Sequence, residues 1–238
     1  MQPDYAPIVE RLSLTKPLVG YYDAPDPAPF EPLVLPKGRQ CVFKAYTDWM
    51  DGKTLHLTRE RHGCGYLMGE VEPRPRDEMI EFLCDEEGLR ASHELMGLWL
   101  DALRHYEPRN DHVLVGPLRA DQYDHLRTVT FFVNPDQLSV LCLGATYYSR
   151  PDDLPPLLCR FGAGCMQMLT LFDDLEAPQA LIGTTDDAMR GELEPCTLGF
   201  TATRPMFELL CTWAHDPKSS LHSRWLDGLI GRRGGSLA

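Results

Sequence analysis

The sequence lacks most of the short motifs that identify a reaction. It contains no Gly-x-Ser-x-Gly, no Gly-x-Gly-x-x-Gly and no Gly-x-x-x-x-Gly-Lys, which argues against a serine hydrolase, a dinucleotide-binding enzyme and a nucleoside triphosphatase. No two of its cysteines are separated by two residues, so the ligand spacing of a zinc ribbon or a ferredoxin is absent as well. Any site has to be assembled from segments that lie far apart in the sequence.

Long apolar runs and basic patches are also missing. The most apolar windows, such as 138–147, fall short of the roughly 20 residues of a membrane helix. The 35 acidic residues outnumber the 23 basic ones, giving a formal net charge of −12, which disfavours contact with nucleic-acid phosphates. The start, MQPDYAPIVERL, does not read as a secretion signal. We therefore expect a cytoplasmic protein without nucleic-acid or membrane partners, and the oligomeric state stays open.

What the sequence does have is cysteine, eight in all, in two similar glycine-rich contexts. RHGCGYLMG at 61–69 and FGAGCMQML at 161–169 each place a cysteine, Cys64 or Cys165, beside glycine. Without a secretion signal these cysteines are not expected to form disulfides, so each is a buried apolar residue or a reactive or ligating thiol. Glycine lets the backbone approach a ligand closely, and the glycines in question are Gly63, Gly65, Gly162 and Gly164.

Other candidate ligands were sorted by their surroundings. Cys41, at the start of a predicted helix after PKGRQ, is the third expected ligand. His62 and Cys196 are weaker candidates, since a loop histidine is commonly just solvated and Cys196 only begins a strand. The remaining cysteines lie in apolar helices or a strand and are expected to pack in the core: Cys84, Cys142, Cys159 and Cys211.

Alternating strand and helix patterns predict an α/β fold, with a mixed sheet and helices on its faces. We expect one domain over 1–238, with a helical insert at 77–106 divided near Gly88 and a disordered tail at 231–238. A strand (17–22 or 128–133), a helix (41–50 or 136–147), a further strand (54–58 or 157–161) and a glycine-cysteine turn recur in that order. This suggests related β-α-β units within halves 15–75 and 113–215, packed about a pseudo-twofold axis that brings the two turns to one seam.

Several of these motifs together resemble the cysteine-rich proteins catalogued as domain of unknown function 169. The resemblance runs from about residue 15 to 212 and is carried by GCGYLMG, VGPL, TVTFFVNPDQLSVLCLGATYYS, FGAGCMQML and GTTDDAMRGELEPCTLGFTATRPMFELL. It implies family cysteines at Cys41, Cys64 and Cys165 but no established activity. Many relatives carry a further Gly-Cys where this chain has Gly183-Thr184, so the resemblance implies three thiolates with one open position.

Two hypotheses follow, and whether the protein is an enzyme stays open between them. In the first, Cys41, Cys64 and Cys165 hold a metal, an iron–sulfur cluster first and zinc as the alternative, that serves a small-molecule substrate or a redox partner. In the second, the protein is a metal-free small-molecule-binding module whose cysteines only pack. Its pocket would be lined by the aromatic pairs at 21–22, 131–132 and 147–148.

Overall fold

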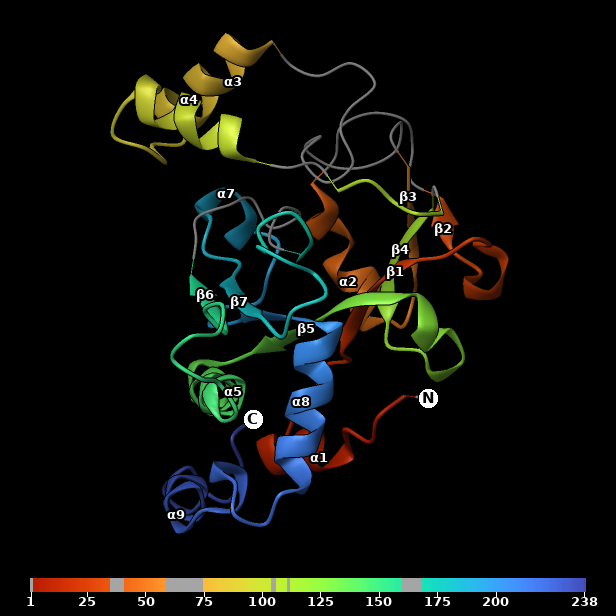
Figure 1. Ribbon diagram of the computed structural model, residues 1–238, viewed down its shortest axis with the longest axis vertical. Helices are drawn as coiled ribbons and strands as arrows, with labels where there is room; N and C mark the ends of the chain where they lie inside the picture. The colour runs from red at the N-terminus through yellow and green to blue at the C-terminus, as the bar shows by residue number, and fades with distance from the viewer. Residues whose placement is uncertain (1, 35–40, 59–74, 104–105, 111, 160–167) are drawn as a thin grey trace.

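The protein is built around one eight-stranded mixed sheet (Figure 1). The computed structural model describes residues 2–34, 41–58, 75–103, 106–110, 112–159 and 168–238. The strand order is β2-β3-β4-β1-β5-β8-β7-β6. Only the outer pairs, β2 with β3 and β6 with β7, are parallel. The strands are β1 (Val19–Asp23), β2 (Leu33–Val34), β3 (Leu55–Leu57), β4 (Val113–Pro117), β5 (Leu126–Val133), β6 (Leu157–Cys159), β7 (Ala180–Gly183) and β8 (Leu198–Thr203).

Helices cover both faces, which confirms the predicted α/β class. One face packs against α1 (Ala6–Leu12), α5 (Pro135–Thr146), α8 (Arg204–His215) and α9 (Arg224–Arg232). The other face, which we call the thiol face because Cys41 leads into its first helix, packs against η2 (Val42–Ala45), α2 (Tyr46–Met50), residues 168–171 and α7 (Asp187–Arg190). Short 3-10 turns at η1 (Ala28–Phe30), η4 (Ala120–His125) and η5 (Ser220–His222) complete the connections.

The two halves of the sheet have the same strand order. From the outer edge to the centre, β2-β3-β4-β1 and β6-β7-β8-β5 show the same sequence of parallel and antiparallel pairs. This corrects the expected register of the repeat, because β6 corresponds to β2 and not to β3. The strand order also places β4 in the first half of the repeat, although residues 113–117 were expected in the second half. The pseudo-twofold axis itself stays a prediction.

The corrected register has a consequence for the cysteines. The predicted repeat matched the helix at 41–50 with the one at 136–147, but α2 and α5 pack on opposite faces of the sheet. In the corrected alignment Cys41 follows β2 by seven residues, and Cys165 follows β6 by six. Cys41 and Cys165 are therefore the pair in equivalent places, and Cys64 follows β3.

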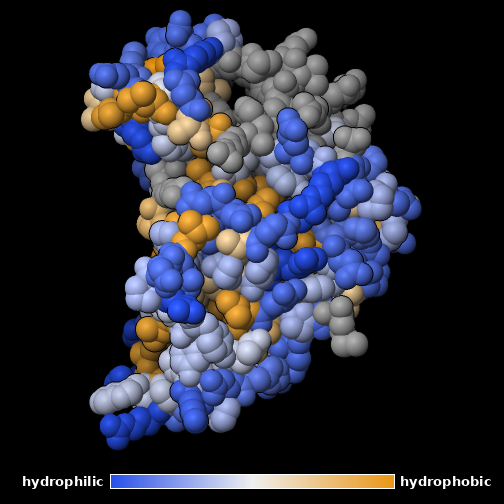
Figure 2. All heavy atoms as spheres, in the orientation of Figure 1, coloured by the Kyte–Doolittle hydropathy of each residue, from blue (hydrophilic) through white to orange (hydrophobic). Residues whose placement is uncertain are grey.

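The helical insert is confirmed as α3 (Arg76–Glu81), a π-helical turn η3 (Phe82–Glu86) and α4 (His93–Ala102), with Gly88 in the left-handed region at φ 65° between them. It projects from one end of the molecule (Figure 1). Leu95 and Leu98 of α4 are exposed, and Figure 2 shows apolar atoms gathered over α4. The expected disorder of 231–238 is wrong, since Leu237 is buried and its carbonyl accepts a hydrogen bond from Asn134.

Gly116 on β4 is a site where packing leaves no room for a side chain. An added Cβ would lie 2.7 Å from the Thr54 Cα, a backbone atom that cannot move aside alone. We expect Gly116→Ala to lower the free energy of unfolding by about 1–3 kcal/mol, as overpacking a core does. Urea denaturation measures it, with Gly191→Ala as control, because nothing lies within 4 Å of a Cβ there. Equal stability of the two variants would contradict the expectation.

Candidate metal centre

Cys41 is the predicted ligand that the structure places most clearly. It immediately precedes η2, its carbonyl accepts the Lys44 N–H at 3.1 Å, and its side chain is exposed. It is not in a disulfide. A solvent-accessible thiol at the start of a packed helical segment is a suitable metal ligand, because the helix fixes its backbone while the sulfur stays reachable.

An aromatic cluster fixes the helix that Cys41 begins. Phe132 of β5 lies among three rings of η2 and α2, with centroid distances of 6.3 Å to Phe43, 5.1 Å to Tyr46 and 6.2 Å to Trp49. All four side chains are almost fully buried. The helix therefore lies over the carboxyl end of β5 on the thiol face, and Cys41 is two residues before the first ring.

The chain that follows Cys165 reaches the same strand and the same face. The Thr128 hydroxyl of β5 donates a 2.9 Å hydrogen bond to the carbonyl of Met168, which is buried and three residues after Cys165. Thr128 and Phe132 are four residues apart, which is about 13 Å along a strand, and an even spacing puts both on one face. Cys41 is two residues from Phe43 and Cys165 is three residues from Met168, separations that span at most about 7–10 Å of chain.

The β7–β8 connection borders this region and carries backbone strain. Thr184 and Cys196 both have φ of 61°, a conformation that costs non-glycine residues energy and is unusual for a β-branched one. Thr184 is held by accepting the Gly199 N–H at 2.6 Å, and Gly199 pairs with Phe132 across the strands. Thr184, where the family resemblance implies a cysteine in many relatives, thus lies beside the strand position that supports α2.

The same connection alters the pKa of a tyrosine on α2. Burial, together with the negative charge of Glu194, raises the pKa of Tyr46 to about 12. Glu194 is paired with Lys16 at 2.9 Å, and Lys16 also donates to the Thr197 hydroxyl at 3.4 Å. Cys196, a weaker candidate ligand, lies between Glu194 and Thr197 in the sequence, and its side chain is exposed. The segments that bear Cys41 and Cys196 are therefore neighbours, because the charge of Glu194 acts on Tyr46.

Seven predicted site residues lie outside the described residues, and the structure does not test them: His62, Gly63, Cys64, Gly65, Gly162, Gly164 and Cys165. Of the cysteines assigned to the core, Cys211 is buried, and burial raises its pKa to about 12. Cys142 is half-buried, with its pKa also raised by burial. Cys159 is exposed, so the expectation of a buried strand residue was wrong, because β6 is an edge strand.

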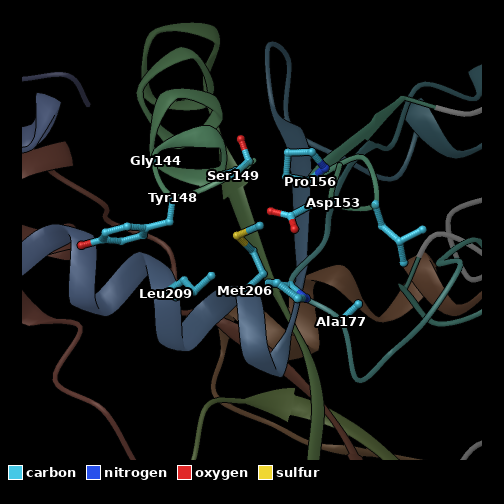
Figure 3. Close-up of a pocket in the computed structure, with 11 residues that line it drawn as sticks. Gly144, Tyr148, Ser149, Asp153, Pro156, Ala177, Met206 and Leu209 are labelled. Atoms are coloured by element: carbon cyan, nitrogen blue, oxygen red, sulfur yellow. The ribbon is translucent and has the colours of Figure 1, made fainter. Parts of the chain in front are cut away.

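A cavity of about 260 Å³ lies on the other side of the sheet, between α5, α8 and the turn before β6. Asp153 and Met206 face the same space, and Tyr148 lies at its side (Figure 3). Of the aromatic pairs expected to line a pocket, only Tyr148 does so here. The 21–22 and 131–132 pairs are buried in the two halves of the core.

The fold and this geometry define an α/β protein whose mixed sheet supports, on one face, two segments that each follow a predicted ligand cysteine. The chain belongs to the family of domain of unknown function 169, described as uncharacterised ArCR, whose profile matches residues 7–212. No curated protein and no solved structure matches the sequence significantly. None of the helices in the described part of the chain combines the length and apolar content needed to span a bilayer.

Proposed function

We propose that this protein binds a metal through Cys41, Cys64 and Cys165, and that the loaded centre serves a redox partner or a small-molecule substrate. The observation that carries the proposal is that Phe132 and Thr128, on one face of β5, anchor the segments that follow Cys41 and Cys165. Two segments that follow cysteines 124 residues apart in the sequence are thereby anchored on one strand.

The chemistry of the donors supports a thiophilic metal. Three thiolates are soft ligands that suit an iron–sulfur cluster or zinc. Because the family resemblance implies a cysteine in many relatives where this chain has Thr184, a fourth thiolate is missing there, and a three-thiolate site leaves one coordination position open. Open positions are typical of catalytic metal centres, and closed four-ligand sites are typical of structural ones. An iron–sulfur cluster is our first choice and zinc our second.

Anaerobic purification from cells supplied with iron and zinc tests the proposal. We expect wild-type protein to carry iron and acid-labile sulfide, and Cys41→Ser, Cys64→Ser and Cys165→Ser each to lose most of that iron and sulfide, because two remaining thiolates are too few. Cys142→Ser is the matched control, since that thiol packs against the opposite face of the sheet. Metal-free wild-type protein, or full occupancy in the Cys41→Ser and Cys165→Ser variants, would exclude the site.

A metal-free binding module is the second candidate, favoured by the cavity between α5 and α8. Its volume is just below the 300–1,000 Å³ common for small-molecule sites, and its walls are largely apolar, with the Asp153 carboxylate inside (Figure 3). Under this reading, elemental analysis finds no metal, and the reactivity of Cys41, Cys64 and Cys165 toward an alkylating reagent is the same with and without added metal.

A further inference from the structure

Three side chains of metal-ligating type lie together on the helical insert. They are Cys84 and Asp85 in the π-helical turn η3 and His93 at the first position of α4. One ligand atom from each lies within 4.8 Å of the other two. The His93 Nε2 is 2.9 and 2.8 Å from the two Asp85 carboxylate oxygens. A sulfur, a nitrogen and an oxygen donor therefore lie close enough together to approach one cation.

The π-helical turn is what brings the two neighbouring ligands to one side. The Glu87 N–H donates to the Phe82 carbonyl at 3.0 Å, an i→i+5 bond that widens the turn. A wider turn rotates less per residue than an α-helix, so consecutive side chains diverge less. Such turns are rare and occur frequently at functional sites, which makes this one an observation independent of the ligand cluster.

The third ligand is fixed by the start of α4. The Ser92 side chain accepts the Leu95 N–H at 3.2 Å and caps the helix, which sets the position of His93. A small core of Ile80, Leu83 and Met96 joins the two arms of the insert. The geometry of the cluster is thus determined by a packed hairpin rather than by a free loop.

The surroundings favour a cation that arrives from solvent. Asp85 and His93 are more than half exposed, and the half-buried Cys84 thiol donates to the Arg90 carbonyl at 3.3 Å. The guanidinium of Arg90 is directed elsewhere, since it lies over the Trp99 ring at 5.2 Å and donates to the Leu89 carbonyl. Carboxylates at positions 86, 87 and 94 add negative charge nearby.

We propose that Cys84, Asp85 and His93 form a second, independent site for a divalent cation of the zinc class, with its fourth position open to solvent. Zinc accepts sulfur, nitrogen and oxygen donors together, at bond lengths that put tetrahedral ligand atoms about 3.3–3.8 Å apart. Rotation of exposed side chains covers the difference from 4.8 Å. This site has no ligand in common with the one formed by Cys41, Cys64 and Cys165. It can therefore be confirmed or refuted independently of the proposed function.

Site-resolved alkylation of the full-length wild-type chain, with and without added Zn²⁺, tests the site. We expect Zn²⁺ to slow alkylation of Cys84 at least tenfold, because a bound thiolate is not free to react. Cys159 is an exposed thiol in the same chain that belongs to neither proposed site, and it should not be protected. Protection of Cys41, Cys64 or Cys165 would be read out separately, so the outcome for the first site does not affect the second.

Two ligand variants and one control variant test whether the protection of Cys84 requires Asp85 and His93. His93→Ala and Asp85→Asn should each abolish protection of Cys84, and His222→Ala, which changes a histidine far from the insert, should leave it intact. Unchanged Cys84 reactivity with Zn²⁺ in wild-type protein, or protection that survives both ligand variants, would overturn the site. Melting curves of each variant verify that it is folded.

Discussion

Phe132→Ala should lower the free energy of unfolding by about 3–5 kcal/mol, the range for removing a buried phenylalanine. Phe132 is the ring around which Phe43, Tyr46 and Trp49 gather, so its loss opens a cavity between β5 and the helix that follows Cys41. The packed aromatic pairs add about 0.5–1.5 kcal/mol each beyond their buried area. Urea denaturation followed by tryptophan fluorescence measures the change, because Trp49 lies in the same cluster.

The neighbouring residue on β5 is a matched control. Phe131 is as fully buried as Phe132 but faces α8, and its ring contacts Phe207 of α8 and Phe200 of the neighbouring strand β8. We expect Phe131→Ala to destabilise by a similar amount. The milder Phe132→Leu and Phe131→Leu should remain folded and differ in metal content, because only Phe132 positions the segment bearing Cys41. If the two leucine variants retain equal amounts of metal after anaerobic purification, the inference that Phe132 positions the Cys41 segment is refuted.

Elements with strong local signals were predictable from the sequence. Asn134, Pro135 and Gln137 supply a capping box and a proline at the first turn of α5, and Thr203 caps α8 directly after β8. These interactions span only a few residues, so the sequence pattern indicates them. Helices α1 and α9 were missed. Helix α1 is only two turns long, and α9 ends inside the glycine-rich segment 231–238 that was expected to be a disordered tail.

Long-range features were not predictable in the same way. β2 has two residues inside a proline-rich loop, and it exists because it pairs with β3. The face on which each helix packs depends on the whole strand order, which is why α2 and α5 looked equivalent in sequence. The repeated cysteines were detected from sequence, but their register, Cys41 with Cys165, required the pairing of β6 with β7. Cys84 resembled core filler because the π-helical turn that exposes its neighbourhood has no recognised sequence signal.

Asp23→Ala should be the second large loss, about 2–4 kcal/mol at neutral pH, because it leaves several buried donors without an acceptor. Asp23 is almost fully buried at the end of β1. Its carboxylate accepts the Tyr106 hydroxyl at 2.5 Å, the Arg109 N–H at 2.7 Å and the Asn110 N–H at 3.0 Å. These bonds fasten the chain that leads from the helical insert into β4. A shape-preserving control is Asp23→Asn, which keeps one acceptor but turns an amide toward the donors.

The charge of Asp23 makes this loss depend on pH. Burial by itself raises the pKa of Asp23, but the hydrogen bonds from Tyr106, Arg109 and Asn110 outweigh it and lower the pKa below its ordinary value. A carboxyl with a lowered pKa in the folded state stabilises the protein above its unfolded pKa of about 3.9, and this contribution disappears as the pH falls through the folded value. The difference in unfolding free energy between wild-type protein and Asp23→Asn should therefore be constant from pH 7 to 5 and shrink below about pH 4. Urea titrations at each pH measure it, and a difference that widens on acidification would mean that the carboxyl is not held ionised by these donors.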